Sequence, residues 1–514
     1  MLSLYSIVRT AIVHGIESVP VYVEADVSDG LPMFEMVGLL SAEVREAKER
    51  VRTALRNLGH TLPARRITIN LYPAYVKKSG SSYDLPIAVA VLAAMGVIRA
   101  ELLDRLLIIG EIGLNGDIQP IHGVLPLVAQ AREQGIERCM VPSGNETEAA
   151  LAEQIQILPV AHLRNVIHIL NTEEFENKEE RAVPKEPEEK SCLDFSDIHG
   201  QHFVKRACEV AVSGMHHMLM IGPPGAGKTM VAKRIPSILP ALTRAEQLEL
   251  SKIYSVCGLL DNQSALLTER PFRCPHHTIS PQGLSGGGSV PKPGEISLAH
   301  KGVLFLDELT EFRHETLEIL RQPLEEHQIR LVRISGAYTF PADFMLVCAM
   351  NPCSCGYYPD RERCNCSPAM LERYTKKISR PLLDRIDICV EARQMEYREL
   401  TGEQKQEESS ETIRERVAVA QERQRHRFRG TELCYNSRIP AADLEKYCSL
   451  TEKEKKYMEH IYEKMGLTAR TYHKILKVAR TLADMEDQTD IGMNHLSEAI
   501  CYRSADRQYR EGAV

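Results

Sequence analysis

The sequence predicts an α/β protein whose central part is a parallel sheet flanked by helices. Residues 218–221 form a short apolar run, a glycine-rich loop follows, and residues 230–235 have helical character. Two further apolar runs, 302–306 and 344–350, have the length of buried strands and are separated by helix-like segments. Strands that alternate with helices are typical of a parallel sheet.

The glycine-rich loop fits the phosphate-binding pattern G-x-x-x-x-G-K-[ST]. Its residues are Gly222, Pro223, Pro224, Gly225, Ala226, Gly227, Lys228 and Thr229. Backbone N–H groups and a helix N-terminus attract phosphate, and glycines let the main chain approach it. We therefore expect ATP to bind here, with Lys228 on the β- and γ-phosphates and Thr229 on Mg²⁺. A plain Gly-Pro turn is the alternative, and the full match between strand and helix leaves it little room.

The apolar run 302–306 ends in Asp307 and Glu308. The carboxyl end of a parallel strand lies at the ligand edge of its sheet. We expect Asp307 to hold the water shell of Mg²⁺ and Glu308 to polarise the attacking water. An Asp-Glu pair alone is often a solvated turn, but together with the phosphate loop it favours ATP hydrolysis.

Composition indicates a multi-domain enzyme of the cytoplasm. The chain has 514 residues, enough for roughly three domains of about 150 residues each. Its net charge of −7 gives no global sign of nucleic-acid binding. The N-terminus lacks a secretory signal pattern, and the uncharged run 85–98 is shorter than the about 20 residues of a membrane span. Fourteen cysteines without a signal predict reduced thiols or a metal site.

Composition shifts divide the chain into five regions. Residues 171–190 are rich in glutamate and nearly free of apolar side chains, so they predict an exposed linker. Residues 1–170 form a first domain, with strand-like alternation at 19–27 and 66–72 and helical spacing at 42–58. The nucleotide domain spans 191–394, a charged linker helix 395–430, and a helical lid 431–514. In the lid we expect helices at 444–465, 469–485 and 494–502.

Two polar residues downstream complete the predicted ATPase site. Asn351 follows the apolar run 344–350, where its amide can sense the γ-phosphate or simply form an Asn-Pro turn. Arg385 lies among apolar residues and two acids. It is either a local salt-bridge partner or an arginine finger for the neighbouring subunit's γ-phosphate. Head-to-tail contacts that close would make a ring.

These motifs resemble those of AAA+ ATPases of the magnesium-chelatase and MCM-helicase branch. Segments 272–278, 286–288 and 293–300 are similar to the YifB/ComM group of magnesium-chelatase-like proteins, and the resemblance covers nearly the whole chain. It implies a homohexameric motor whose competence-associated members are branch-migration helicases acting on DNA. It also implies that Arg385 is the trans arginine finger and Arg470 the sensor-two arginine of the lid.

In that branch the segment between the two nucleotide motifs carries a pore-facing hairpin. Here it spans about residues 273–296 and includes Lys292, His276 and His277. A pore-facing loop is favoured over a plain surface loop. A zinc site at the two histidines is disfavoured, because adjacent side chains rarely chelate one ion.

Four cysteines follow Asn351 within fourteen residues. They are Cys353, Cys355, Cys364 and Cys366. Four thiolates can surround one tetrahedral Zn²⁺, although the C-x-C spacing departs from the usual pairs. Structural zinc and a chance cluster of free thiols are both open.

The first domain resembles the proteolytic domain of Lon. Segments 77–88 and 110–123 match the regions that carry the Lon serine and lead to its lysine. Ser82 falls at the nucleophile, but Leu125 falls at the lysine. A serine needs a base to become a nucleophile, so a non-proteolytic relative is expected, which can still assemble a ring or bind DNA.

A basic stretch offers one candidate DNA contact. Its arginines are Arg414, Arg416, Arg423, Arg425, Arg427 and Arg429. Phosphate pairing would make binding salt-dependent, but a solvated linker helix paired with Glu415 and Glu422 is slightly favoured.

Three functions are compatible with these residues. The first is a hexameric ATP-driven DNA translocase or branch-migration helicase. The second is a remodelling chaperone or metal-insertion motor of the magnesium-chelatase type, although such a subunit would begin near the ATPase core. The third, an ATP-dependent Ser-Lys protease, requires the missing lysine.

Overall fold

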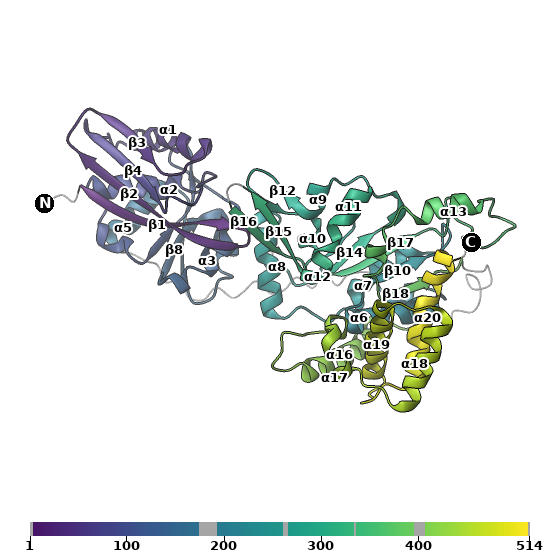
Figure 1. Cartoon of the computed structure of the whole chain (residues 1–514). Coiled ribbons are helices and arrows are strands. Elements are labelled where there is room, and N and C mark those ends of the chain that lie inside the picture. The colour runs from purple at the N-terminus through teal and green to yellow at the C-terminus, as the bar shows by residue number, and fades with distance from the viewer. Residues whose placement is uncertain (1–3, 174–192, 261–265, 334–335, 395–406, 512–514) are drawn as a thin grey trace.

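The computed structural model describes residues 4–173, 193–260, 266–333, 336–394 and 407–511. The molecule is elongated, with the N-terminal sheet at one end and the phosphate-loop sheet with the C-terminal helices at the other (Figure 1). Most of the predicted linker at 171–190, and residues 395–406 of the predicted charged segment, lie outside the described residues.

The N-terminal part is built on a seven-stranded mixed sheet in the order β3-β4-β2-β1-β5-β8-β9. Antiparallel pairs join β1 (Tyr5–His14), β2 (Glu17–Ser28) and β4 (Arg66–Tyr72), whereas β3 (Met33–Val37) runs parallel to β4. Beyond β1, the strands β5 (Leu106–Ile108), β8 (Arg138–Pro142) and β9 (Gln156–Val160) are parallel. The strands predicted at 19–27 and 66–72 are confirmed.

Helices and short pairs complete this part. They are α1 (Ala42–Asn57), α2 (Asp84–Ala94), α3 (Val124–Ala129), α4 (Glu146–Ala149), α5 (Leu163–Thr172) and the β6–β7 pair (Glu111–Ile112 and Ile118–Gln119). Every residue of α2 is buried, which explains its uninterrupted apolar sequence. Its first residue, Asp84, is paired with Arg50 of α1 through a 2.6 Å bond to Nε. The helix predicted at 42–58 is confirmed.

The central sheet has five parallel strands in the order β11-β14-β17-β10-β18. Their bounds are Phe272–Arg273, Val303–Leu306, Met345–Met350, Met218–Ile221 and Ile388–Glu391. Successive residues of β14 alternate between two hydrophobic clusters, since Phe305 faces one and Leu304 the other. Because both faces are covered, each strand is apolar throughout. The predicted α/β core is confirmed.

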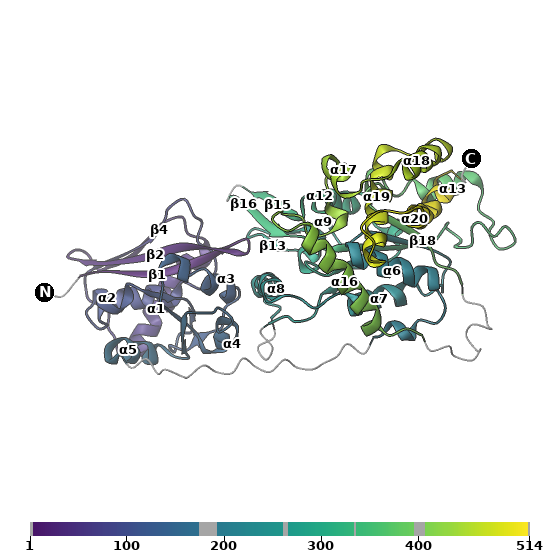
Figure 2. The same cartoon turned by 90° about the horizontal axis from the view of Figure 1, so that it is seen from below.

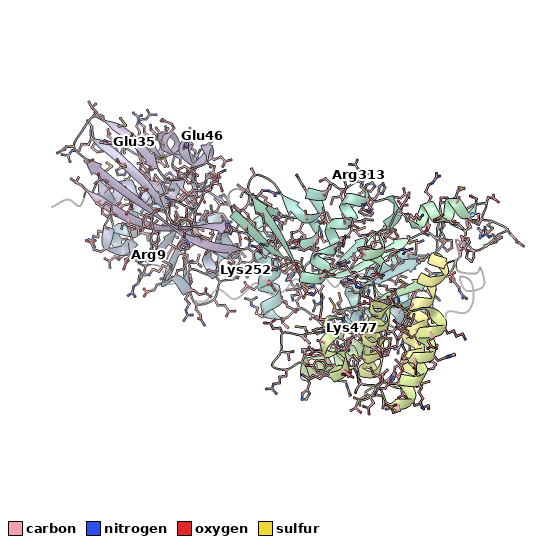
Figure 3. The ribbon with its side chains drawn as sticks, viewed as in Figure 1. Arg9, Glu35, Glu46, Lys252, Arg313 and Lys477 are labelled. Carbon is pink, nitrogen blue, oxygen red and sulfur yellow. The ribbon has the colours of Figure 1, made fainter. Side chains whose placement is uncertain are left out.

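Helices α6 (His202–Gly214), α7 (Lys228–Ile238) and α16 (Ser410–Arg427) pack on one face of this sheet with the C-terminal helices (Figure 1). The short helices α9 (Pro281–Ser285), α10 (Glu295–Leu298), α11 (His314–Glu318) and α12 (Pro323–Glu326) cover the other face. The helix α8 (Arg244–Cys257) lies near the N-terminal part, where Lys252 is labelled in Figure 3.

The C-terminal helices are α17 (Leu444–Tyr447), α18 (Glu452–Met465), α19 (Ala469–Met485) and α20 (Met493–Glu511). Those predicted at 469–485 and 494–502 are confirmed, but the single helix predicted at 444–465 is wrong. The helix α17 ends at Tyr447, and α18 begins after Thr451, whose hydroxyl donates a hydrogen bond to the Glu454 carboxylate. A threonine followed by glutamate three residues later is a helix-start pattern, and here it overrides continuous helical spacing.

Two β-hairpins extend from the central sheet. The pair β12 (Gly286–Gly287) and β13 (Lys292–Pro293) lies inside the predicted 273–296 insertion. The longer pair β15 (Gln328–Arg333) and β16 (Gly336–Pro341), which the sequence analysis did not identify, reaches the turn of β1–β2 (Figure 2). There Tyr338 stacks on His14, with ring centroids 4.2 Å apart.

No helix within the described residues is both long enough and apolar enough to span a membrane.

Candidate functional site

The phosphate loop joins β10 to α7 at the carboxyl edge of the central sheet. Gly225 and Gly227 have φ of +76° and +78°, which favour glycine. Gly222 is required for packing, because a Cβ there would lie 2.1 Å from the Ala392 carbonyl oxygen. The Gly222 N–H donates to the Met350 carbonyl at 3.2 Å, so the loop is tied to the end of β17.

Lys228 joins the loop to Asn351. Its Nζ donates to the carbonyls of Gly222 at 2.6 Å and Pro223 at 3.0 Å, and to Asn351 Oδ1 at 3.2 Å. The side chain is buried, and this burial lowers the pKa of Lys228. The ammonium group of Lys228 therefore contacts Asn351, which lies 123 positions away in the sequence.

Thr229 and Asp307 form the second part of this site. The Thr229 hydroxyl donates to Asp307 Oδ2 at 2.7 Å, and Asp307 Oδ1 accepts the Glu308 N–H at 2.9 Å. A hydroxyl and a carboxylate at this spacing supply oxygen ligands of the kind Mg²⁺ prefers. The residues predicted to hold Mg²⁺ thus lie in contact with each other.

Glu308 has an unusual backbone. Its φ of +50° is in the left-handed region, which is strained for a residue with a Cβ. Its side chain is 60% exposed, and one carboxylate oxygen lies 3.7 Å from His277 Nδ1. From sequence, His277 is expected in a pore-facing or plain surface loop or, less favoured, at a zinc site, because a pairing 31 positions away has no local signature.

The two predicted arginines lie apart from the loop. Arg385, which follows α14 (Arg380–Leu383), donates to the Pro381 carbonyl at 2.5 Å and pairs with Glu325 of α12. Neither described partner belongs to the phosphate loop. Arg470 is exposed in the first turn of α19 and has no hydrogen bond or ion pair among the described side chains.

The four clustered cysteines lie next to the phosphate loop. Their sulfurs all lie within 4.8 Å of one another, and Cys353 Sγ is 3.2 Å from Cys355 Sγ and 3.8 Å from Cys364 Sγ. Among the residues that the structure describes, this is the one cluster of three or more His, Cys, Asp or Glu side chains that could hold a metal ion. His276 and His277 are not part of such a group.

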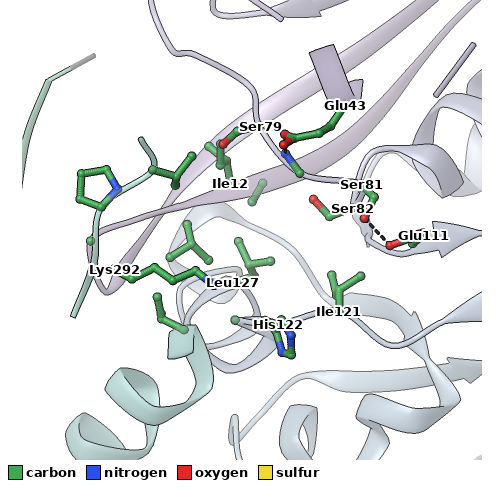
Figure 4. Close-up of a pocket in the computed structure, with 18 of the residues that line it drawn as sticks. Ile12, Glu43, Ser79, Ser81, Ser82, Glu111, Ile121, His122, Leu127 and Lys292 are labelled. Atoms are coloured by element: carbon green, nitrogen blue, oxygen red, sulfur yellow. Dashed lines mark hydrogen bonds between the residues drawn. The ribbon is translucent and has the colours of Figure 1, made fainter. Parts of the chain in front are cut away.

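Ser82 lines a pocket of about 470 Å³ between the N-terminal part and the β12–β13 hairpin (Figure 4). Ser81 bonds Glu111, and Lys292 reaches into the same pocket from β13. Leu125 is absent from this lining and packs instead with Leu151. The sequence analysis found no base near Ser82 and missed Lys292, which the tertiary fold brings to the pocket.

The arginines of α16 are largely neutralised within the protein. Arg416 bonds Glu209 at 2.6 Å and also pairs with Glu408. Arg423 pairs with Asp487, and Arg427 pairs with the buried Asp484. This pairing supports the linker-helix interpretation of the basic stretch.

Comparison with known proteins agrees with this geometry. The family models that match are described as magnesium chelatase, subunit ChlI, over residues 194–400; subunit ChlI of Mg-chelatase, over 23–145; and the ChlI C-terminal region, over 407–503. An archaeal Lon protease of Pyrococcus abyssi is 26% identical over 149 residues, which cover 28% of this chain and 15% of the protease.

Two relatives match over nearly their full length. The YifB protein of Salmonella typhimurium is 39% identical over 503 residues, covering 98% of this chain and 97% of the relative. The competence protein ComM of Haemophilus influenzae is 39% identical over 500 residues, covering 96% of each chain. The chain therefore belongs to the YifB/ComM family of magnesium-chelatase-like AAA+ proteins.

Proposed function

We propose that this protein is a Mg-ATP-hydrolysing motor that assembles as a hexamer and moves on DNA in the cytoplasm. Its proposed substrates are single-stranded or branched DNA, as for a branch-migration helicase or translocase in recombination or DNA uptake. The observation that carries the motor assignment is the joined set of Lys228, Thr229, Asp307 and Asn351 at one sheet edge.

Each residue of the site has a proposed role in hydrolysis. Lys228 binds the β- and γ-phosphates in place of its present carbonyl partners. Thr229 and Asp307 hold Mg²⁺, directly and through its water shell. Glu308 orients and deprotonates the attacking water, and Asn351 senses the γ-phosphate. When nucleotide binds, the Glu308 carboxylate can leave His277 and contact the attacking water instead.

The position of Arg385 supports a ring. Its described partners belong to its own chain but not to its own phosphate loop, so a γ-phosphate that it reaches would belong to a neighbour. Arg470, at the start of α19, is free to turn toward bound nucleotide in its own chain or an adjacent one. Head-to-tail contacts of this kind close into rings.

The β15–β16 hairpin supports DNA as the substrate. Arg330 and Arg333 are both exposed on β15, and neither has an ion pair among the described residues. Four of the five arginines of α16 instead pair with acidic side chains. Free guanidinium groups pair well with phosphate. The relative ComM is named a competence protein, which agrees with a role in DNA uptake.

A second candidate is a remodelling chaperone or metal-insertion motor, favoured by the matching models' description as magnesium chelatase subunits. Proteolysis is disfavoured because Leu125, at the position of the Lon lysine, cannot act as a base and is absent from the pocket that Ser82 lines. For the N-terminal part we propose ring assembly or DNA binding without cleavage. A structural Zn²⁺ at the four cysteines belongs to the same proposal and is argued in the following subsection.

The deciding experiment measures ATPase rates with no DNA, single strand, duplex and a four-way junction, each at two salt concentrations. Glu308→Gln serves as the blank. It should lower the rate by about a hundredfold or more while ATP still binds, because a general base contributes about 10²- to 10⁴-fold. Stimulation by single-stranded or branched DNA that weakens with salt would support the DNA motor. Rates indifferent to every DNA would refute it in favour of a protein client.

Arginine variants locate the DNA contact. Arg330→Ala with Arg333→Ala should weaken DNA stimulation and flatten its salt dependence, because each lost phosphate contact reduces the salt slope by about one. Arg425→Ala is the matched control, since Arg425 pairs with Glu422 at 2.8 Å on α16. Equal losses in both variants would contradict the assignment of the hairpin.

A further inference from the structure

The segment between β17 and α13 (Pro368–Thr375) contains neither helix nor strand over residues 351–367, and it lies at the end of the molecule away from the N-terminal sheet (Figure 1). Its own hydrophobic cluster is small. Besides Cys353, Cys364 and Cys366 it contains one further buried residue, Leu371, with two half-buried tyrosines packed against it. So little apolar contact among the described residues calls for another source of order.

The four sulfurs are arranged as a metal would require. Zinc–sulfur bonds of about 2.3 Å place the corners of a tetrahedron about 3.8 Å apart. The Cys353 sulfur is 3.2 Å from that of Cys355 and 3.8 Å from that of Cys364, and the full set fits within 4.8 Å. These thiols are separate rather than paired in disulfides.

Hydrogen-bond donors surround the sulfurs. The Tyr358 N–H donates to Cys353 Sγ at 3.4 Å, and the Ser354 hydroxyl lies 3.4 Å from Cys366 Sγ. Such outer donors orient metal-ligating side chains. Four thiolates so close together would repel one another without a cation between them.

The same loop touches the nucleotide site. Gly356, at φ +91°, lies so close to Pro224 of the phosphate loop that a Cβ there would be 2.6 Å from Pro224 Cδ. Upstream, the loop starts at Asn351, which bonds Lys228. Downstream, Tyr374 of α13 accepts a 2.9 Å bond from Thr310, two residues after Glu308. Three contacts thus connect the cysteine loop to both nucleotide motifs.

We propose that Cys353, Cys355, Cys364 and Cys366 bind one structural Zn²⁺, and that the loop held by this metal sets the positions of Pro224 and Asn351 for ATP. The metal keeps four protein ligands, so it has no open position for chemistry. The bracing role rests on the proposed ATP site, whereas the metal site stands on its own geometry.

The test begins with the full-length protein. Zinc is measured by elemental mass spectrometry, and ATP affinity by equilibrium binding of a fluorescent ATP analogue with Mg²⁺. We expect about one zinc per chain. Cys364→Ser with Cys366→Ser should lose the zinc and weaken ATP binding. Cys434→Ser, which alters an exposed cysteine outside the cluster, should retain both.

A second variant tests the brace without touching a ligand. Gly356→Ala keeps all four thiols, so zinc should remain, but its methyl group pushes on Pro224. We expect a loss of up to about a hundredfold in kcat/KM for ATP, the effect of an about 1 Å displacement near a reacting group. Gly430→Ala is the control, because Gly430 has a similar φ of +82° with no atom within 4 Å of an added Cβ.

The outcomes are distinct. Protein that takes up no zinc, even when zinc is supplied during purification, would overturn the metal site. Zinc-free Cys364→Ser/Cys366→Ser protein that binds ATP as tightly as wild type would overturn the brace. Neither measurement uses DNA, so a failure of DNA stimulation would refute the motor's substrate and leave this inference intact.

Discussion

Replacing His217 with asparagine is expected to halve the loss of unfolding free energy that the protein undergoes between pH 7 and pH 5. His217 precedes β10 and is buried, and its carbonyl accepts the N–H groups of Asp387 and Ile388 at 3.0 and 3.1 Å. Its Nδ1 accepts the Leu346 N–H at 3.1 Å, so the ring is neutral at this nitrogen. Burial lowers the pKa of His217 to about 3.

The direction of this pH effect follows from the unfolded chain, where the histidine pKa is 6.5. As pH falls below 6.5 the unfolded state gains a proton that the folded state does not, so folding stability is lost between pH 6.5 and 3. Asp387 opposes the low pKa of His217, whereas Arg438, Lys474 and His327 reinforce it.

Between pH 7 and pH 5 this linkage amounts to about 2 kcal/mol for His217. Burial, and next the guanidinium of Arg438, lower the pKa of His327 to about 4, which adds a comparable amount. The wild-type free energy of unfolding should therefore fall by about 4 kcal/mol over this range, and that of His217→Asn by about 2 kcal/mol.

Urea unfolding followed by circular dichroism at both pH values provides the measurement. Asparagine keeps an acceptor for the Leu346 N–H but does not titrate. The two proteins are therefore compared by the change in their free energy of unfolding between pH 7 and pH 5, and not by their absolute stability. Equal pH differences for the two proteins would refute a buried neutral His217.

Three further predictions concern the ring, the loop and the C-terminal helices. Lys228→Ala and Arg385→Ala should each lower the ATPase rate by at least about a thousandfold. If Arg385 acts on the ATP site of a neighbouring subunit, mixing the two variants should restore part of the activity. No recovery on mixing would favour action within one chain. Gly222→Ala should abolish ATP-analogue binding, because its methyl group would overlap the Ala392 carbonyl, and binding at wild-type affinity would contradict that geometry. Asp484→Asn should lower the free energy of unfolding by about 3–5 kcal/mol, because its buried carboxylate forms ion pairs with Arg427 and Arg480. The control Glu422→Gln removes an exposed ion pair and should change the free energy of unfolding by less than about 1 kcal/mol.

The lid illustrates what sequence patterns leave open. Helical spacing predicted α19 at its observed bounds, but not what α19 holds. Lys474 of α19 and Arg503 of α20 both donate to the Ile386 carbonyl, at 2.8 and 2.7 Å. The next residue after Arg385 is therefore fixed by the lid, and Lys477, labelled in Figure 3, donates to the Ser437 carbonyl at 3.1 Å. Such contacts connect positions 40 to 117 residues apart and have no local signature.

The sequence by itself predicted the phosphate loop, the Asp307–Glu308 strand end, the strands β2, β4, β10, β14 and β17, and the helices α1, α19 and α20. These depend on neighbours in the chain: glycine at tight backbone turns, apolar runs in buried strands, and helical spacing on one face. It also identified the four cysteines, which lie within one short segment.

Only the tertiary structure decided which charges remain available and which segments meet. It paired Arg416, Arg423 and Arg427 of α16 with Glu209, Asp487 and Asp484. It also left Arg330 and Arg333 exposed, brought Lys292 to the pocket that Ser82 lines, and placed the cysteine loop against Pro224. The physical reason is that burial and ion pairing depend on distance in space, and packing brings together groups whose separation along the chain carries no information about their contact.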